Sequence, residues 1–476
     1  MITRNLLISS VTALALMGCA AGPDRVSSSP PSLDARSGPF LSAQAGVVTA
    51  SPLPGDWWRL YRDPVLDGLV ADALAANTDI RQAVARIDRA RAALRGAGSD
   101  RLPQVGLSAS GGYGRTPADQ TPPGADRSGG SFSLGADLAY EVDLFGRVSG
   151  GIEAAKNDEA AARADADAVR VMVAADTTQA YADAASAAAR LRVAQSIVAL
   201  LDDSLRLTRL RHDAGMTDGL AVARIETLRD QRAATIPAIA ADRSAALFAL
   251  ATLTGRTPAQ LPPITGERTV PLEIAVPLPV GDGAQLLARR PDVRAAERRV
   301  MADAARIGVA RADLYPRVVL GGSIGTAASS VGNLFSGNPL GFLLGPLVDW
   351  AFPNREPVYA RIDAANADAA ESLAAFDGAV LTALQETETA LSDYARALER
   401  RRELDRALAA ASRAARIVRA QNREGLVDSL QTLDAERTLA ETQADLAQQD
   451  AIVSQRQIAV FRALGGGWSA QAGDPA

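Results

Sequence analysis

The stretch TDIRQAVARIDRARAALRGAGSDRLPQVGLSASGG, residues 78–112, decides the fold because the chain contains it twice. The second copy, PDVRAAERRVMADAARIGVARADLYPRVVLGGSIG, spans residues 291–325. In both copies an aspartate, Asp79 or Asp292, lies 24 positions before a proline. Each copy passes from an Ala/Arg-rich helical pattern, through that proline, into a short strand pattern. A repeat of this size predicts two supersecondary units that fold alike.

The N-terminus carries the features of a lipoprotein signal. Residues 1–18 contain Arg4 and a short apolar core, and Cys19 follows as the only cysteine of the chain. The apolar core is too short to span a bilayer as a helix. We therefore expect Cys19 to become the lipidated first residue, with no disulfide within the chain. No later uninterrupted apolar run approaches the length of a membrane helix, so any membrane span must consist of strands.

The strand pattern is clearest at residues 132–144. Apolar side chains occupy every even position, and small, polar or acidic side chains, among them Asp137 and Glu141, occupy the odd positions. This alternation is typical of a half-buried strand in a soluble sandwich or of a lipid-facing strand in a membrane barrel. No other β region besides the strands near the two copies is expected. With the lipoprotein signal this favours the barrel, with Asp137 and Glu141 facing its lumen.

The strands recur with the copies, and long helices follow them. Strands are expected at residues 105–114, 132–144, 318–325 and 340–350. A helix with a heptad seam of mostly alanine and leucine is expected at residues 151–212, and its return helix at 220–253, kinked by Pro237. The second half repeats this with helices at 357–422 and from 430 to the glycines at 465–467.

Each helix pair turns back at a glycine. Gly215 and Asp218 match Gly425 and Asp428 at a constant offset of 210. Either aspartate can serve as a helix N-cap. Arg211 and Arg423 lie close to the two turns in the sequence.

The composition gives no sign of catalysis or nucleic-acid binding. The 476 residues carry a net charge of −5, with 47% hydrophobic but only 4% aromatic residues. Low aromatic content suits long helices packed by alanine, and nucleic-acid binding needs a clustered basic face. His212 is the single histidine, so a His-based triad or a His-rich metal site has no partners. We expect no enzyme, no metal and no cofactor other than the lipid on Cys19.

The order of these patterns predicts six segments. They are a signal peptide at 1–18, an extended lipid-anchored tether at 19–55, a first repeat at 56–255, a proline-rich linker at 256–283, a second repeat at 284–467 and a tail at 468–476.

Several short motifs carry a family resemblance across residues 56–468. The chain resembles the outer-membrane factors of tripartite efflux systems, in the lipoprotein, NodT or OprM-like branch of the TolC-like family. The motifs are Trp57-Trp58, Asp63-Pro64, Asn77, Asp79, Arg81 and Leu102-Pro103 in the first half, and Arg290-Pro291-Asp292-Val293-Arg294, Tyr315-Pro316, Gly425-Leu426-Val427-Asp428, Leu433-Asp434-Ala435 and Ala463-Leu464-Gly465-Gly466-Gly467-Trp468 in the second.

The resemblance implies a homotrimer in the outer membrane of a Gram-negative bacterium. Each subunit would give four strands to a shared twelve-stranded barrel and its helices to a coiled-coil tunnel in the periplasm. The tips Gly215, Met216, Gly425 and Leu426 would meet a periplasmic adaptor, whose docking opens a narrow aperture. Asp218 and Asp428 would crowd at that aperture, where the nearby Arg211 and Arg423 would balance their charge. An inner-membrane pump, commonly of the resistance–nodulation–division class, would supply drugs, metals or metabolites for export.

Two other protein classes share some of these features. A lipid-anchored periplasmic adaptor also has long helical hairpins, but it has one hairpin flanked by soluble β domains. A lipid-anchored structural coiled coil would not need the amphipathic strands. The two copies of a strand pair with a hairpin favour the efflux channel over both.

Overall fold

The computed structural model describes residues 38–467, apart from 45, 125 and 337–339. The predicted signal peptide, Cys19 and the tail at 468–476 lie outside the described residues. The chain divides into two compact units. We call residues 86–163 and 295–377 the sheet unit, and the described parts of 32–85, 164–294 and 378–476 the hairpin unit.

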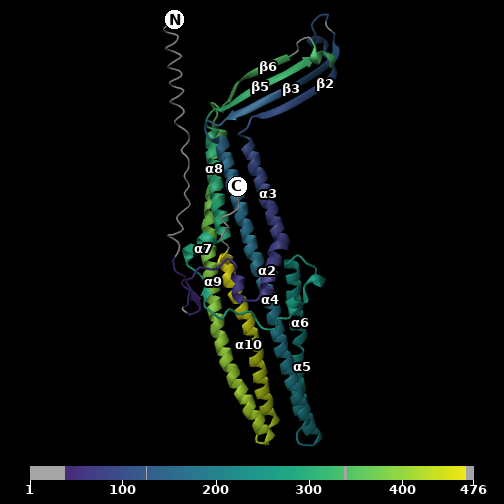
Figure 1. Cartoon of the computed structure of the whole chain (residues 1–476), viewed down its shortest axis with the longest axis vertical. Helices are drawn as coiled ribbons and strands as arrows, with labels where there is room; N and C mark the ends of the chain where they lie inside the picture. The colour runs from purple at the N-terminus through teal and green to yellow at the C-terminus, as the bar shows by residue number, and fades with distance from the viewer. Residues whose placement is uncertain (1–37, 45, 125, 337–339, 468–476) are drawn as a thin grey trace. The chain divides into compact units, whose positions relative to one another are not determined.

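The sheet unit contains one antiparallel four-stranded sheet (Figure 1). The strand order is β2-β3-β5-β6, so that β2 and β6 are the two edges. All four predicted strands are confirmed, and each has at least the 9–11 residues that cross a bilayer at a tilt. Their bounds are β2 Gln104–Arg115, β3 Ser128–Val142, β5 Arg317–Ala328 and β6 Leu340–Asp349.

The register gives the sheet one apolar face. Leu138 of β3 lies opposite Val105 on one side and Gly322 on the other, and Gly322 pairs with Leu344. These side chains share a face with Leu107 and Phe342, which are 84% and 79% exposed. Asp137, as predicted, lies on the other face. That face also carries exposed Leu343 and Leu347 on β6, so it is not polar throughout.

The four strands join helices at the same end of the sheet. The helices are α3 Thr78–Ser99, α4 Arg147–Asp213, α8 Pro291–Ala312 and α9 Glu356–Arg423. Within the sheet unit α4 approaches α8 closely, because a Cβ on Gly150 would lie only 3.0 Å from the side chain of Val309. Arg306 of α8 also pairs with Asp158 of α4. A small residue at the crossing thus lets the two helix backbones come close.

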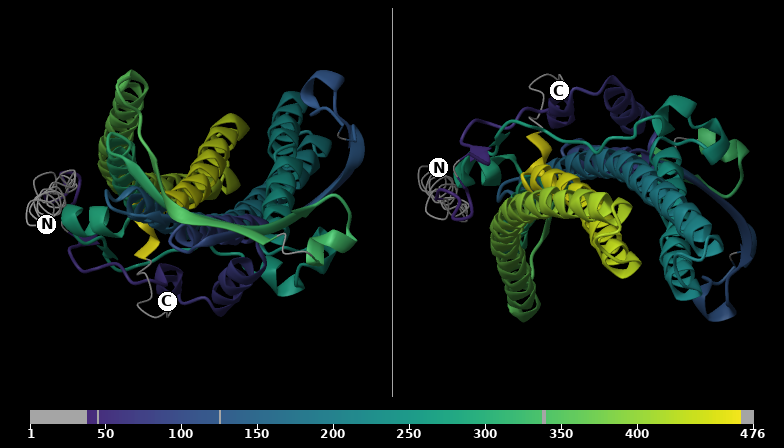
Figure 2. Two further views of the ribbon diagram at one scale, coloured as in Figure 1. Left: turned by 90° about the horizontal axis from the view of Figure 1, so that it is seen from above. Right: turned by 90° about the horizontal axis from the view of Figure 1, so that it is seen from below.

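Two helix pairs form the lower part of the hairpin unit in Figure 1, and Figure 2 shows them from the ends. Ile197 of α4 and Leu228 of α5 belong to one apolar cluster, and Ala415 of α9 and Leu439 of α10 to another. The return helices are α5 Gly219–Ala233, α6 Ile236–Leu253 and α10 Ser429–Ala463. The predicted kink at Pro237 is a break between α5 and α6, because Pro237 occupies the first turn of a new helix.

The main core of the hairpin unit gathers residues from distant parts of the sequence. The ring of Trp57 stacks on Phe461 at 4.6 Å between centroids. Helices α2 Pro64–Ala76 and α7 Gly283–Arg289 pack against this core. Asp63 caps α2 and accepts hydrogen bonds from the Tyr181 hydroxyl at 3.1 Å and Arg268 at 2.8 Å. The large side chains thus lie where α4, α10 and the short helices meet.

The described part of the predicted tether, residues 38–55 without 45, is not an extended tether. Phe40 and Leu53 are buried, and Glu388 of α9 accepts hydrogen bonds from the backbone nitrogens of Leu41 and Ser42. The short strands β1 Val48–Thr49 and β4 Leu278–Pro279 pair in parallel, which also corrects the expectation of no further β region. Too few apolar residues stand in this segment for a periodicity to show.

The predicted linker is folded onto the same unit. It contains the 3₁₀ turns Pro258–Gln260 and Pro263–Gly266. Its apolar side chains Leu272, Ile274 and Leu278 are buried in the main core. Isolated apolar residues between prolines carry no periodic signal, which is why this packing could not be predicted.

Two described helical stretches are long and apolar enough to span a membrane by length and composition alone, Arg147–Asp213 and Gly219–Leu253. This differs from the expectation of no such stretch, and alanine accounts for much of the hydropathy. In α4, Ala174, Ala180 and Tyr181 pack in the main core of the hairpin unit. This part of α4 is therefore covered by protein, whereas only 11% of the apolar window in Gly219–Leu253 is buried.

Candidate functional site

The hairpin unit presents two sharp turns where its long helices end. Gly215 and Gly425 both adopt left-handed backbone angles, with φ of 72° and 74°. The nitrogen of Met216 donates to the Arg211 carbonyl at 2.8 Å, and that of Leu426 to the Gln421 carbonyl at 2.9 Å. This is the arrangement in which a glycine ends a helix by satisfying its last carbonyls. The predicted tips are therefore real turns with the same backbone geometry.

Asp218 and Asp428 both cap the helices that follow the turns. The Asp218 carboxylate accepts from the Ala221 nitrogen at 3.0 Å, and the Asp428 carboxylate from the Gln431 nitrogen at 2.9 Å. Such caps satisfy backbone donors that have no partner within the helix. The capping alternative is thus confirmed for both residues, and a role of either at a pore aperture stays a prediction.

A hydrogen bond joins the ends of the two long helices. Arg211 of α4 donates to the side-chain oxygen of Asn422 of α9 at 2.5 Å and to its carbonyl at 3.3 Å. Among the described residues no ion pair links Arg211 or Arg423 to Asp218 or Asp428. Arg211 is directed to the other hairpin, and a role of Arg211 and Arg423 in balancing the tip aspartates stays a prediction.

The two tips enclose a cleft and expose apolar side chains. A cleft of about 690 Å³ lies between them, lined by Arg211, Asp218, Asn422 and Asp428 among others. Met216 and Leu426, at matching positions of the two turns, are each 74% exposed. Exposed apolar side chains are typical of partner-binding surfaces where they form a contiguous patch. Each tip exposes one such side chain beside a polar cleft.

The acidic residues of β3 differ in their surroundings. Glu141, at the helical end of the strand, pairs with Arg147 and with Arg317, the latter at 2.8 Å. Asp137 lies on the same face further along β3, opposite Gly106 and Ser323. The negative charge of Glu141 is therefore balanced by two arginines at the end of the sheet where the strands meet the helices. The assignment of both carboxylates to a lumen stays a prediction.

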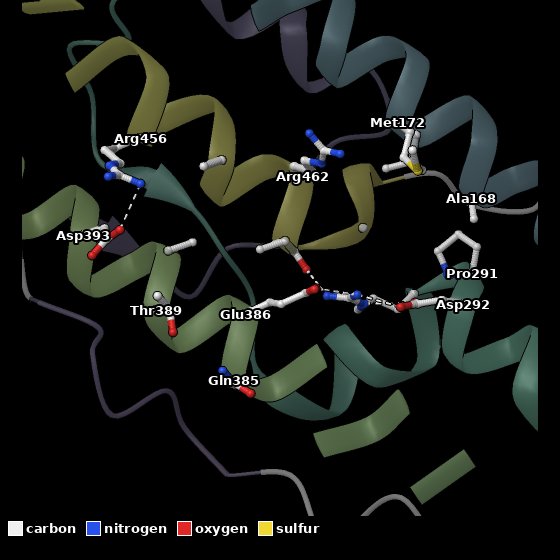
Figure 3. Close-up of a pocket in the computed structure, with 16 residues that line it drawn as sticks. Ala168, Met172, Pro291, Asp292, Gln385, Glu386, Thr389, Asp393, Arg456 and Arg462 are labelled. Carbon is white, nitrogen blue, oxygen red and sulfur yellow. Dashed lines mark hydrogen bonds and ion pairs between the residues drawn. The ribbon is translucent and has the colours of Figure 1, made fainter. Parts of the chain in front are cut away.

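A second cleft lies in the hairpin unit around a buried arginine (Figure 3). Arg290 pairs with Asp292 at 2.6 Å and Glu386 at 2.8 Å, and it donates to the Ala463 carbonyl at 2.9 Å. In Figure 3, Asp292 and Glu386 both point toward this guanidinium, and Arg456 pairs with Asp393 nearby. We call Arg290, Asp292 and Glu386 the Arg290 cluster.

The charges of the Arg290 cluster stabilise one another. Burial would raise the pKa of Asp292, but hydrogen bonds and charge from Arg290 outweigh it and lower that pKa. Burial likewise opposes the charge of Arg290, yet both carboxylates raise its pKa. The sequence singled out Arg290 only as part of a motif, because burial of an arginine leaves no periodic trace.

Neither cleft has the chemistry of a metal centre. Within residues 38–467, less those left undescribed, no three His, Cys, Asp or Glu side chains are grouped so that they could hold a metal ion. The single histidine, His212, contacts the Thr217 carbonyl at 3.0 Å within its own turn. This contact of His212 stabilises the turn at the end of α4.

A family profile matches the chain in two blocks. The family described as outer membrane efflux protein matches residues 69–256 and 283–466. The two blocks overlap the repeats predicted at 56–255 and 284–467.

Individual relatives and solved structures span nearly the whole chain. Outer membrane protein OprJ of Pseudomonas aeruginosa is 32% identical over 96% of this chain and 94% of its own length. Cation efflux system protein CusC of Escherichia coli O157:H7 is 27% identical over 97% of this chain and 98% of its own length. The structure of the outer-membrane channel OprN has a TM-score of 0.86 and 35% identity, covering 94% of this chain and 100% of that one. The structure of VceC from Vibrio cholerae has a TM-score of 0.80 and 25% identity, and the match covers 88% of this chain and 100% of that one.

Proposed function

Because this chain belongs to the outer membrane efflux protein family, we propose that it acts as one subunit of a trimeric outer-membrane channel. As a member of this family it is a transport protein of the outer membrane with a TolC-like, mostly helical channel fold. It serves as the outer-membrane component of a tripartite efflux system.

One observation carries the proposal: the four-stranded sheet has two open edges and an apolar face. In lipid, unpaired backbone groups at a sheet edge are not tolerated, so the edges β2 and β6 must find partners. The strands alternate in direction, so β6 of one subunit can pair antiparallel with β2 of the next. Three subunits then close a twelve-stranded barrel built from two repeats per chain. The exposed face with Leu107, Leu138 and Phe342 would contact lipid.

The tips of the hairpin unit provide a surface at which a partner protein could bind. Met216 and Leu426 provide exposed apolar contacts, and the turns at Gly215 and Gly425 hold them at equivalent positions. We assign this surface to a periplasmic adaptor, which in turn connects to an inner-membrane pump. The Arg211–Asn422 bond joins the hairpins at the same place, so displacing it on docking is a physical means of opening the aperture.

The relatives are named for different exported compounds. A relative at 29% identity is named as a toluene efflux protein, one at 30% as a pyoverdine export protein, and CusC as a cation efflux protein. Such different cargoes at nearly equal identity indicate that cargo choice lies elsewhere in the system. The channel would accept small molecules that its partners deliver.

We also propose that Cys19 carries the lipid anchor. The support is the short apolar core followed directly by the only cysteine. Mass spectrometry of the N-terminal peptide tests it: a lipid-modified Cys19 as first residue supports the anchor, and an unmodified Cys19 or another start contradicts it. Cys19→Ser should remain in the outer membrane because the strands would also hold the protein there.

Reconstitution tests the channel itself. Purified protein added to planar bilayers should give discrete, uniform conductance steps, and the same protein should fractionate with the outer membrane. A lipid-anchored adaptor or a structural coiled coil would fractionate with membranes through its lipid but would give no conductance. If correctly folded protein gave no conductance steps, the proposal that it forms a channel would be contradicted.

A further inference from the structure

We propose that Arg355, with the rings of Trp350 and Phe352, binds the phosphate of an anionic phospholipid at the helical end of the sheet. This site rests on the proposed function, because it requires the sheet to lie in the outer membrane. We call these three residues the Arg355 stack. Its occupant would be a phospholipid of the leaflet that faces the periplasm.

The position of the Arg355 stack fits the boundary between hydrocarbon and water. Trp350 follows directly on β6, at the end of the sheet where all four strands join helices. Trp350 and Phe352 stack at 4.9 Å between centroids and are 43% and 64% exposed. The Trp350 indole donates to the Leu314 carbonyl at 3.1 Å, which fixes the ring. Exposed aromatic rings at the ends of apolar strands are typical of the membrane interface.

The charge of Arg355 distinguishes it from its neighbours. Arg317 pairs with Glu141 at 2.8 Å, and Arg361 pairs with Asp313 at 3.0 Å. In the part of the chain that the structure describes, no carboxylate lies within ion-pair distance of Arg355. Its buried Nε has no hydrogen-bond partner among the described atoms. Arg355 therefore keeps an uncompensated positive charge at this end of the sheet.

The two rings position the Arg355 guanidinium so that it can bind the oxygens of a phosphate. The Arg355 Cζ lies 5.3 Å from the centroid of Trp350 and 5.7 Å from that of Phe352, within cation–π range. A stacked guanidinium keeps its donors in one plane, which suits the oxygens of a phosphate. A lipid offers both that phosphate and acyl chains for the apolar face beside β6. An anionic phospholipid therefore matches the site in charge and in hydrophobicity.

Quenching of tryptophan fluorescence by brominated lipids tests the site. The full-length protein is placed in phosphatidylcholine vesicles that contain a small fraction of brominated phosphatidylglycerol or of brominated phosphatidylcholine. The Trp350→Phe variant identifies the part of the signal that belongs to Trp350. We expect phosphatidylglycerol to be enriched at Trp350 by about fivefold over its bulk fraction, the effect of about one arginine at an anionic surface.

Matched variants give the control. Arg355→Gln should abolish the enrichment, and Arg355→Lys should retain part of it. Arg361→Gln, near the start of α9 and already paired with Asp313, should leave it unchanged. Equal quenching by both lipids in the wild type, or an enrichment that survives Arg355→Gln, would overturn the site.

A second probe separates this proposal from the channel. A Leu344→Trp variant in the Trp350→Phe background reports whether the apolar face lies in lipid. Quenching at that position without enrichment at Trp350 overturns the headgroup site alone. No quenching of Leu344→Trp by either lipid contradicts the membrane placement of the sheet, and the proposed function with it.

Discussion

Asn77 and Arg290, which stand at the same position of the two sequence copies, each donate to the last carbonyl of a return helix. The Asn77 amide donates to the Leu253 carbonyl at 3.0 Å, and Arg290 donates to the Ala463 carbonyl at 2.9 Å. Leu253 ends α6, and Ala463 ends α10. Helix ends carry carbonyls without partners, and a donor placed there stabilises them. In each half, the residue before the short copied helix thus anchors the end of the hairpin.

Arg290→Ala should destabilise the protein more than Asn77→Ala does. Arg290 also donates hydrogen bonds to the carboxylates of Asp292 and Glu386. Its loss removes these bonds to charged groups and should lower the free energy of unfolding by about 2–3 kcal/mol. Thermal unfolding in detergent, measured for both variants, checks the order. Equal losses would mean that the carboxylates of the Arg290 cluster contribute nothing.

The Arg290 cluster should also give stability a pH dependence. The pKa of Asp292 is lowered in the folded state, so its contribution is present above the unfolded value of about 4 and is lost as the pH falls through the lower folded value. The difference in melting temperature between wild type and Asp292→Asn should therefore shrink from pH 6 to pH 3. A difference that is constant across this range contradicts the role of Asp292 as a charged partner.

The Arg211–Asn422 bond should hold the tips closed. Arg211→Ala removes a bond between hairpins of about 1 kcal/mol, which should raise the ratio of open to closed channel about fivefold. Single-channel recording in planar bilayers measures this ratio. Arg209→Ala is the matched control, because Arg209 pairs with Glu226 inside one hairpin. If both variants gate alike, the bond between hairpins has no part in closure.

Two substitutions of Asp428 separate its cap from its charge. Asp428→Ser keeps an oxygen that can accept from the Gln431 nitrogen but removes the charge, whereas Asp428→Ala removes both and should cost about 1 kcal/mol. A charge at a constriction predicts reduced cation preference in both variants. Ion selectivity in planar bilayers decides the matter. Unchanged selectivity in Asp428→Ser, with lower stability only in Asp428→Ala, leaves the residue a helix cap.

The orientation of β3 in the membrane can be tested with two neighbouring residues. Leu138 lies on the apolar face and Ala139 on the other, opposite Gln104. Leu138→Arg should cost about 2–4 kcal/mol near the middle of the bilayer, and Ala139→Arg much less. Heat-resistant oligomer on gels measures assembly. Loss of assembly in Ala139→Arg but not in Leu138→Arg would reverse the assigned facing.

Periodic parts of this protein could be predicted from its sequence, and packed irregular parts could not. The period of two fixed the faces of β3, as Leu138 and Asp137 show, and the heptad seam located α4, where Val173, Thr177 and Leu201 are buried. The turns followed from glycines that take left-handed angles. At the tips, the caps made by Asp218 and Asp428 became visible only with side-chain geometry, and a role of their charges at an aperture stays a prediction.

The missed features all depend on contacts between distant residues. The burial of Phe40 and Leu53, the pairing of β1 with β4 and the partners of Arg290 join segments that are far apart in sequence. A single chain without periodicity carries no local signal for such contacts. The same holds for the hydrogen bond from Arg211 to Asn422, whose two helix ends are far apart in the sequence.

Cysteine crosslinking between the two edges of the sheet tests the shared barrel most directly. In a Cys19→Ser background, Leu107→Cys on β2 is combined in turn with Phe342→Cys, Leu344→Cys or Val348→Cys on the same face of β6. Ser110→Cys with Ser133→Cys is the control within one chain, since those hydroxyls lie 2.8 Å apart. The barrel predicts covalent dimers and trimers on denaturing gels for at least one edge pair, and only monomer for the control. Monomer for every edge pair, from protein in the outer membrane, would contradict it.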